Sequence, residues 1–375
     1  MKHLLLRDLD WPAMCRTLGG LGVGERAARK VFAHVHARWA SSLDDLDLLS
    51  AQTRRQIAEI AAFPDLEIVE RRRASDGFVK YLFRLADGGQ IEAVRIPLPD
   101  PQEARLLKEK RKRGEACGLV ALPTAKYTVC ISSQVGCALA CAFCATGKLG
   151  FSRNLSTWEM VAQVQAIARD ADHAIRGVLF LGMGEPLLNY DNVLRTARIL
   201  CHPAGLAISA DAISISTAGI VPAIRRLAAE NERFRLIVSL AAPTTEARLP
   251  LMPVEQTWAL AELVAAIRDY TAVHKGRVTL AYVAISGVNM SREAARKIAE
   301  LFAGVPVKVN LIDVNDASGE FQPPTDEEVR AFRDELGAAS IPVARRYAGG
   351  LDIGAACGTL AATRQGGTVY GESGA

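Results

Sequence analysis

Residues 135–147 read VGCALACAFCATG and place three cysteines, Cys137, Cys141 and Cys144, in one short loop. Three thiolates can bind three irons of a [4Fe–4S] cube and leave the fourth iron open to a ligand that is not protein. An open metal position is where chemistry occurs, as in catalytic zinc sites. A structural zinc site would need a fourth Cys or His nearby, but the next histidine is His173, beyond a helical segment. The spacing therefore favours a catalytic iron–sulfur cluster over zinc or three incidental buried thiols.

Length and composition leave room for a catalytic domain of barrel size and a small accessory domain. The chain has 375 residues, of which 50% are hydrophobic, and its net charge of +4 does not by itself indicate a nucleic-acid partner. Eight cysteines in a chain this long do not indicate a disulfide scaffold. The first residues include acids and lack the apolar core of a signal peptide, and no apolar run reaches membrane-spanning length. Because such a cluster needs reduced thiols, we expect a cytoplasmic protein without membrane contact.

The N-terminal part, residues 1–98, is predicted to form an accessory domain. Apolar residues recur at helical spacing in three segments, 11–22, 25–40 and 50–63. Alternating apolar and polar residues in 78–99 then predict a β-hairpin that turns at an Asp-Gly-Gly sequence.

A linker or insert at residues 99–123 follows the hairpin. It contains a basic run made of Lys108, Lys110, Arg111, Lys112 and Arg113. A run of this kind is either a solvated loop or a contact to phosphates, and the sequence leaves both open.

The core, residues 124–375, alternates strand and helix patterns. The apolar, strand-like runs are 128–133, 177–184, 212–217, 235–242, 278–285, 307–314 and 342–347. Amphipathic helical stretches separate most of them, which is typical of parallel βαβ units. About six such units predict an α/β fold with an incomplete (βα)6 barrel rather than a full eight-stranded barrel. In such a barrel the catalytic residues belong at the C-terminal ends of the strands.

Conspicuous residues follow several of these strands. The segment GMGEP, residues 182–186, comes one strand after the cysteine loop, and its glycines let backbone approach a ligand closely. Glu185 could accept hydrogen bonds from the amino group of S-adenosylmethionine (SAM), which can chelate an open iron through its amine and carboxylate. Ser216, Ser239 and Asn315 end three further strands. Any one of them is more often a helix cap, but together they indicate polar contacts to one shared ligand.

Two cysteines outside the loop also stand out. Cys130 lies in the strand just before the cysteine loop, and Cys357 lies in the small-residue segment GGLDIGAACGTL near the C-terminus. A buried cysteine is usually an inert part of the core, so neither residue alone predicts a role. We assign no role to the remaining cysteines, Cys15, Cys117 and Cys201.

Taken together, the motifs resemble the RlmN/Cfr-type radical SAM RNA methyltransferases. The resemblance runs from about Trp11 to Leu360 and rests on GCALACAFCATGKLGFSRNLS, LGMGEPLLNYDNV, ISISTAGIVPAI, IVSLAAP and LDIGAACGTLA. It implies a radical SAM barrel and a [4Fe–4S] cluster held by Cys137, Cys141 and Cys144. The SAM contacts that it implies are Gly184, Glu185, Ser216, Ser239, Leu240, Ala241 and Asn315.

The resemblance also implies a mechanism that uses two SAM molecules per turnover. Cys357 accepts a methyl group from the first SAM, and one electron from the cluster cleaves the second to a 5′-deoxyadenosyl radical. That radical removes a hydrogen atom from the S-methyl group, and the resulting carbon radical adds to an sp² carbon of adenine, C2 in the first instance. Cys130 resolves the protein–RNA crosslink through a transient disulfide with Cys357, as in thiol–disulfide exchange. Glu92, in IEAVRIP, is implied as the proton acceptor.

The implied partners are RNA, namely rRNA with tRNA as a further substrate, and an electron donor such as flavodoxin or ferredoxin; we expect a monomer. Three departures leave the substrate open. Ala241 stands where the family usually has histidine, residues 310–316 read NLIDVND instead of NLIPWNP, and the basic insert is longer than usual. The same chemistry on adenine C8 or on another RNA is therefore an alternative. A non-catalytic Fe–S or zinc RNA-binding protein is a third, although it would need neither Cys130 nor Cys357.

Overall fold

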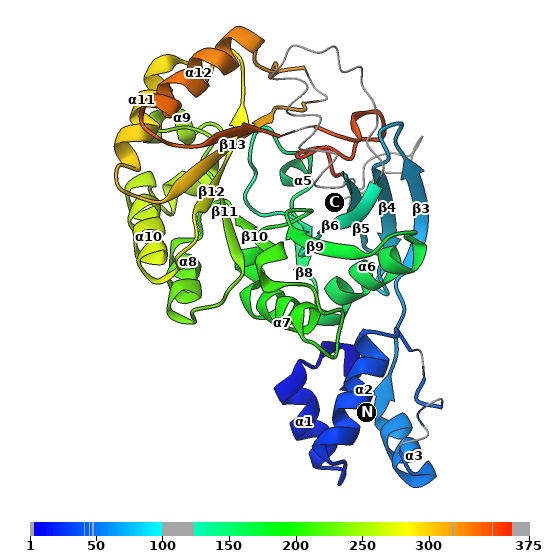
Figure 1. The fold of residues 1–375 in the computed structure, drawn as a ribbon. Coiled ribbons are helices and arrows are strands. Elements are labelled where there is room, and N and C mark those ends of the chain that lie inside the picture. The colour runs from blue at the N-terminus through cyan, green and yellow to red at the C-terminus, as the bar shows by residue number, and fades with distance from the viewer. Residues whose placement is uncertain are drawn as a thin grey trace, which may run out of the picture.

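The structure is a computed structural model that describes residues 4–40, 42–44, 46, 49–99, 124–316, 319–346 and 348–361. A ten-stranded sheet forms its centre (Figure 1). In chain order its strands are β3 (Glu67–Arg73), β4 (Val79–Arg84), β5 (Gln90–Pro99), β6 (Thr124–Ile131), β9 (Ile175–Phe180), β10 (Ile213–Thr217), β11 (Arg235–Ser239), β12 (Val278–Ala284), β13 (Val307–Asp313) and β14 (Val343–Arg345). Their order across the sheet is β14-β13-β12-β11-β10-β9-β6-β5-β4-β3.

The strands from β6 to β13 form the parallel part of this sheet, and each pairs with the next one along the chain. Their apolar residues are buried, as expected for parallel strands covered on both faces. The predicted (βα)6 fold is confirmed, and β14 adds one more parallel strand at the edge. The helices that connect these strands are α6 (Thr157–Asp170), α7 (Tyr190–Cys201), α8 (Val221–Ala229), α10 (Leu260–Val273), α11 (Arg292–Leu301) and α12 (Asp326–Ala338).

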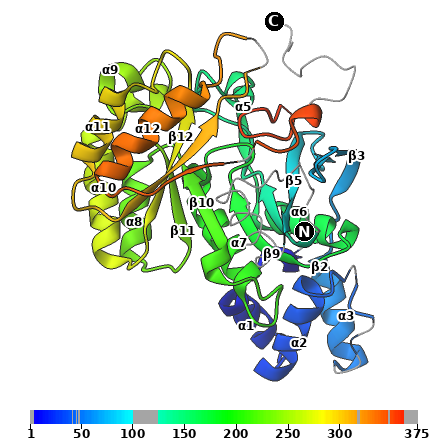
Figure 2. The same cartoon turned by 45° about the horizontal axis from the view of Figure 1, so that its top comes forward.

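Local sequence explains how these helices begin and which face they bury. Ser156 and Glu159 form a capping box at the start of α6, and Thr325 and Glu328 form another at the start of α12. In α11, Ala295 and Ile298 are buried while most of the helix's charged residues are exposed, so the helix covers the sheet with one apolar stripe. Figures 1 and 2 show α8, α10, α11 and α12 along the outer side of β11–β13.

The three N-terminal helices, α1 (Trp11–Gly19), α2 (Glu25–His36) and α3 (Ala51–Ile60), form a lobe beside the barrel (Figure 2). They have a hydrophobic cluster of their own, which Val161 of α6 and Ile199 of α7 join. The short strands β1 (Leu4–Leu5) and β2 (Ala61–Ala62) pair within this part of the chain.

The hairpin β4–β5 extends the barrel sheet, because β5 pairs antiparallel with β6. The sheet is therefore continuous across residue 98, and the domain boundary there remains a prediction. Strand β3 was not predicted. Its sequence, EIVERRR, is mostly charged, and none of its residues is fully buried, as is typical of an edge strand. It therefore lacks the alternating pattern that marks β4 and β5.

The remaining elements are short. They are β7 (Gln134–Gly136), β8 (Phe151–Asn154), α5 (Ala145–Lys148), α9 (Thr245–Arg248) and the 3-10 turns η1 (Leu6–Asp8), η2 (Pro186–Asn189), η3 (Ala210–Ala212), η4 (Pro253–Gln256) and η5 (Leu351–Ile353). No helix in the described part of the chain combines the length and apolar character needed to cross a bilayer. The basic run at 108–113 and Cys117 lie outside the described residues.

Candidate active site

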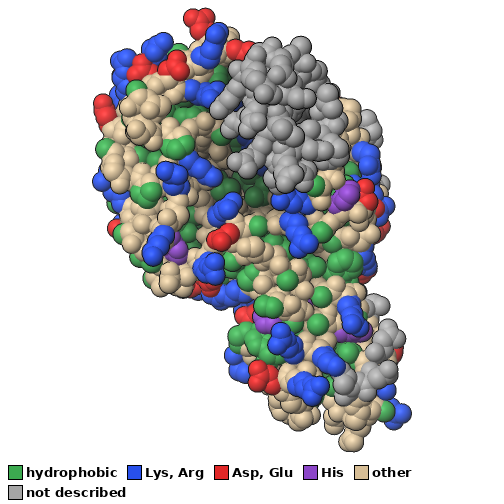
Figure 3. All heavy atoms as spheres, in the orientation of Figure 1, with side chains coloured by type: hydrophobic (Ala, Val, Ile, Leu, Met, Phe, Trp, Pro, Cys, Tyr) green, Lys and Arg blue, Asp and Glu red, His purple; other side chains and the backbone are tan. Residues whose placement is uncertain are grey.

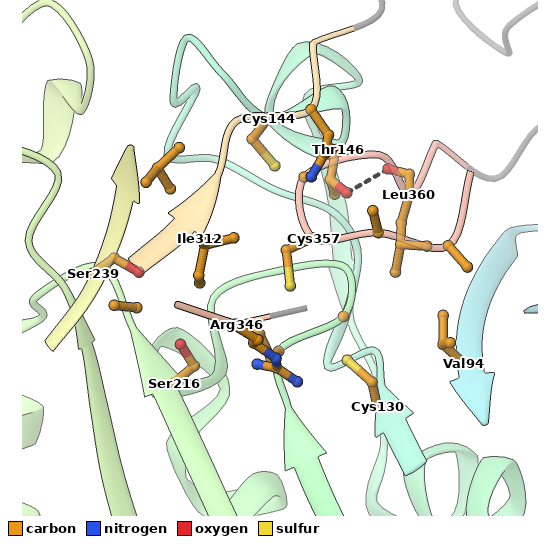
Figure 4. Close-up of a pocket in the computed structure, with 18 of the residues that line it drawn as sticks. Val94, Cys130, Cys144, Thr146, Ser216, Ser239, Ile312, Arg346, Cys357 and Leu360 are labelled. Carbon is orange, nitrogen blue, oxygen red and sulfur yellow. Dashed lines mark hydrogen bonds between the residues drawn. The ribbon is translucent and has the colours of Figure 1, made fainter. Parts of the chain in front are cut away.

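A cavity of about 480 Å³ lies at the C-terminal ends of the parallel strands. Strand ends line one side of it, and the cysteine loop and the C-terminal segment that carries Cys357 line the other. Figure 4 shows Ser216, Ser239, Cys144, Cys130 and Cys357 around this space. The expectation that catalytic candidates gather at this end of the barrel agrees with this arrangement.

The hairpin β7–β8 holds the cysteine loop at its base. Gly136 has φ 73°, and a Cβ there would lie 1.9 Å from the carbonyl oxygen of Gly150, so only glycine fits. The next residue, Cys137, donates its backbone N–H to that same carbonyl at 2.7 Å. Cys144 donates its backbone N–H to the carbonyl of Cys141 at 3.1 Å. The turn therefore presents all three cysteines to the cavity.

These thiols are costly to ionise without a counter-charge. Burial raises the pKa of Cys137 to about 11, and Glu185 and Cys144 add to the shift. Burial also raises the pKa of Cys141, and the neighbouring Cys144 and Cys137 raise it further. A bound cationic cluster removes this cost because it deprotonates the thiols that ligate it. The donor set therefore fits an iron–sulfur cluster.

The geometry of the three cysteines differs from that of a single-ion site. Within the described ranges, no three His, Cys, Asp or Glu side chains converge on one ion position. A [4Fe–4S] cube needs no such convergence, because each thiolate binds a different iron.

Glu185 lies in the cavity wall directly after strand β9. Its side chain accepts hydrogen bonds from the backbone N–H groups of Leu187 at 2.9 Å and Ala218 at 2.7 Å. It is 3% exposed, and burial raises its pKa to about 7. Gly184 precedes it with φ 98°, and a Cβ there would lie 2.5 Å from Cβ of Gln134. The GMGEP turn therefore brings backbone and one carboxylate to the cavity surface.

The other predicted SAM contacts divide into two groups. Ser216, Ser239 and Asn315 line the cavity at the ends of β10, β11 and β13. Leu240 and Ala241 are buried and do not line it. Ala241 has φ 56°, and this turn directs its carbonyl to the side-chain amide of Asn289 at 2.8 Å. Their predicted role in binding SAM remains a prediction.

Cys130 and Cys357 line the same cavity, although they lie on β6 and on the C-terminal segment respectively. Figure 4 shows both sulfur atoms directed into the space. Burial raises the pKa of Cys130 to about 12, and the adjacent Cys357 thiol adds to the shift. The cysteines of the described residues are free thiols, so the predicted disulfide is not present in this structure and remains a prediction.

Glu92, like Leu240 and Ala241, does not line the cavity. It lies on β5 with an exposed fraction of 0%. One carboxylate oxygen lies 3.0 Å from Nζ of Lys80, and the other accepts the backbone N–H of Ala361 at 3.0 Å. The role of proton acceptor remains a prediction.

Two arginines of the site were not identified from the sequence. Arg346 lines the cavity near Cys130, and its positive charge lowers the pKa of that thiol, against the larger effect of burial. Arg248 is fully buried, pairs with Glu255, and donates to the carbonyls of Ala218 at 2.7 Å and Leu240 at 3.1 Å. It thereby fixes the loops that follow Ser216 and Ser239. Neither residue belongs to a local motif, so no sequence signal marks it.

Comparison with known proteins decides the family. The profile of the Radical SAM superfamily matches residues 131–299. A "Probable RNA methyltransferase" from Myxococcus xanthus is 50% identical over 372 residues, which is 98% of this chain and 96% of that protein. A "Dual-specificity RNA methyltransferase RlmN" from Syntrophobacter fumaroxidans is 39% identical over 366 residues, covering 96% and 99% respectively. The chain belongs to the RlmN-type radical SAM RNA methyltransferases.

A solved structure similar to this chain agrees with this assignment. The radical SAM methyltransferase from Sphaerobacter thermophilus is 37% identical and matches with a TM-score of 0.82, covering 96% of this chain and 100% of that one. The predicted resemblance, fold and enzyme class are confirmed. Membership of the radical SAM superfamily also implies the [4Fe–4S] cluster and SAM.

Proposed function

We propose that this enzyme methylates an sp² carbon of adenine in RNA, C2 in the first instance, through an S-methyl group on Cys357. The observation that supports the proposal most is the position of Cys130 and Cys357. Both thiols line the cavity that also holds the three cysteines of the loop and the polar strand ends. A binding module would need neither thiol, whereas a reaction through a covalent adduct needs one sulfur to carry carbon and a second to release it.

Cys357 acts first. Its sulfur forms a bond to the methyl carbon of one SAM, the sulfonium C–S bond breaks, and the thiol proton leaves. Cys137, Cys141 and Cys144 would hold the cluster, which would supply the electron that cleaves a second SAM to a 5′-deoxyadenosyl radical and would accept the electron that the adduct later releases. The S-methyl group of Cys357 loses one hydrogen atom to that radical, and its carbon adds to C2 of adenine.

Cys130 then releases the product. Its thiolate attacks the sulfur of Cys357, a disulfide forms, and the bond between that sulfur and the methylene carbon breaks. The electron pair of the broken bond stays with the methylene carbon. That carbon gains a proton while C2 loses one, which yields the methyl group. An external dithiol reduces the disulfide, and a donor of the flavodoxin or ferredoxin type supplies the priming electron.

RNA is the proposed substrate, with rRNA and tRNA as its two classes. Relatives of this chain are named RNA methyltransferases, some of them of dual specificity. Lys and Arg side chains lie along the uncovered side of the hollow in Figure 3, with acidic atoms beside them, and also occur on the N-terminal lobe. On that lobe Arg26 and Arg29 line a surface pocket beside Glu25, and their guanidinium groups are suited to phosphate contacts. The basic run at 108–113 is a further proposed phosphate contact. A cytoplasmic monomer completes the proposal.

Isotope labelling tests the route. With SAM that carries a fully deuterated methyl group, the methylated adenosine should contain two deuterium atoms and one hydrogen in its new methyl group. The reason is that the S-methyl group of Cys357 loses one deuterium before it meets adenine and regains a proton afterwards. Nucleosides from the treated RNA are analysed by mass spectrometry, and chromatography separates the C2 and C8 products.

The control for this experiment is Cys357→Ala, which should give no methylated nucleoside. A product that keeps all three deuterium atoms would show direct transfer from the sulfonium and would refute the route. RNA binding without any methylated product would instead support the non-catalytic alternative.

The pH dependence of adduct release tests the role of Cys130. Because its pKa is raised to about 12, the residue is mostly a thiol at neutral pH, and the attacking thiolate fraction increases with pH. We expect the rate at which RNA leaves the adduct to rise about tenfold per pH unit between about pH 7 and pH 9. Rapid-quench time courses on denaturing gels measure this rate. A flat profile would contradict attack by a thiol of raised pKa.

A further inference from the structure

The C-terminal segment that carries Cys357, residues 348–361, is held against the barrel at both of its ends. At its start, Asp76 accepts the backbone N–H of Gly350 at 2.9 Å, and Asp352 accepts that of Ser75 at 3.1 Å. These contacts attach the segment to the turn between β3 and β4. They lie on the N-terminal side of Cys357 and leave the thiol directed into the cavity.

The part that follows Cys357 lies against the cysteine loop. Ala145 donates its backbone N–H to the carbonyl of Gly358 at 2.8 Å, and the hydroxyl of Thr146 donates to the carbonyl of Leu360 at 2.6 Å (Figure 4). Gly358 has φ 87°, and a Cβ there would lie 3.2 Å from the carbonyl oxygen of Phe143. The backbone of this part therefore packs directly on the loop that carries the cluster cysteines.

The last contact that holds the segment is made by a buried ion pair between Lys80 on β4 and Glu92 on β5. Lys80 pairs in register with Val94, two residues from Glu92, so the two charged side chains are diagonal neighbours on one face of the sheet. Their exposed fractions are 6% and 0%. A buried carboxylate is costly unless a positive charge or hydrogen bonds compensate it. One oxygen of Glu92 has the charge of Lys80 at 3.0 Å but makes no hydrogen bond among the described residues, and the other accepts the N–H of Ala361.

The main chain of Glu92 is also fixed. Its carbonyl accepts the hydroxyl of Ser132 at 2.6 Å, and its N–H contacts Sδ of Met183 at 3.3 Å. Glu92 is therefore a rigid support whose carboxylate is occupied by Lys80 and Ala361 and does not reach the cavity. A proton acceptor for adenine would instead have to face the cavity.

We propose that Lys80 and Glu92 form a latch for the segment that carries Cys357. Glu92 is then a positioning residue: its carboxylate holds the amide of Ala361, four residues beyond Cys357, and Lys80 holds the carboxylate. The latch rests on the proposed function in one respect only, namely that Cys357 carries the methyl group.

Hydrogen exchange of the unliganded protein tests the latch directly. Glu92→Ala removes the acceptor for Ala361, and we expect the amides of residues 354–361 to exchange about tenfold faster, the size expected for losing a hydrogen bond to a charged group. The double variant K80M/E92Q replaces the pair with neutral side chains of similar size and keeps an amide oxygen for Ala361. It should exchange close to the wild-type rate. The matched control is Glu67→Gln. Glu67 lies on β3 and forms an exposed ion pair with Arg84 of β4, so this variant should leave the exchange rates of residues 354–361 unchanged.

Methylation of Cys357 separates the latch from a proton acceptor. A base that acts on the adenine adduct is not needed when SAM methylates Cys357 before RNA is added. The latch therefore predicts that Glu92→Ala slows this methylation about tenfold, while the double variant retains it and also retains turnover on RNA. Peptide mass spectrometry measures the S-methyl group.

Two outcomes would overturn the latch. The first is a Glu92→Ala protein whose hydrogen-exchange rates and Cys357 methylation equal those of the wild type. The second is a double variant that exchanges at the wild-type rate but does not turn over RNA, which would identify Glu92 as the proton acceptor. If Glu92→Ala does not fold, Ala361→Pro takes its place, because it removes the donor N–H and leaves Glu92 unchanged; the latch then predicts the same faster exchange of residues 354–360, and a wild-type rate would overturn it. Failure of the proposed function is seen separately, as a wild-type protein that never carries a methyl group on Cys357.

Discussion

Cys141→Ala is expected to reduce the iron content from about four atoms per chain to nearly none and to abolish methylation. Cys141 lies between the other two cysteines of the loop, and all three line the same cavity. Two thiolates cannot hold a cube, because the third iron would lose its only protein ligand. Iron and sulfide analysis of anaerobically purified protein, together with the broad visible absorption of such clusters, measures the effect.

Cys201→Ala is the matched control, because Cys201 is partly buried at the end of α7 and does not line the cavity. It should keep its iron and its activity. The same comparison addresses the zinc alternative, since a zinc protein would bind no iron in either variant. A Cys141→Ala protein that keeps its full iron content would refute the assignment of this thiol as a ligand.

The parts of the site that the sequence predicts are those set by local spacing or by strand ends. The cysteine spacing within residues 137–144 is local, so the loop could be identified without any tertiary information. Ser216, Ser239 and Asn315 could be grouped because the C-terminal ends of parallel strands meet at one edge of the sheet. Their shared cavity follows from that topology.

What the sequence does not predict depends on contacts between distant segments. The pairing of Glu92 with Ala361, and of Arg248 with the carbonyls of Ala218 and Leu240, links residues that no pattern connects. The turn at Ala241 is a related case, because Leu240 and Ala241 are buried and do not line the cavity although Ser239 does, and Ala241 has a positive φ that no motif predicts. A motif matched by position gives the residues but not the direction of their side chains.

Cys130→Ala is expected to accumulate the covalent adduct, so that the protein made in cells co-purifies with attached RNA. Cys130 and Cys357 line one cavity, and the Cys357 thiol is close enough to contribute to the raised pKa of Cys130. Without the attacking thiol, the bond between Cys357 and the methylene carbon has no route to cleavage. The substitution removes a single buried sulfur atom, at a cost of roughly 1–2 kcal/mol, so the fold should persist.

Denaturing gels with and without nuclease reveal the attached RNA, and peptide mass spectrometry locates it on Cys357. Wild-type protein should carry little RNA by this assay, because Cys130 releases it. C130A/C357A should carry none, since no sulfur remains to hold the methyl group, whereas Cys201→Ala should resemble the wild type. If Cys130→Ala keeps its cluster and its fold but is free of RNA, the release step belongs to another group that faces the cavity.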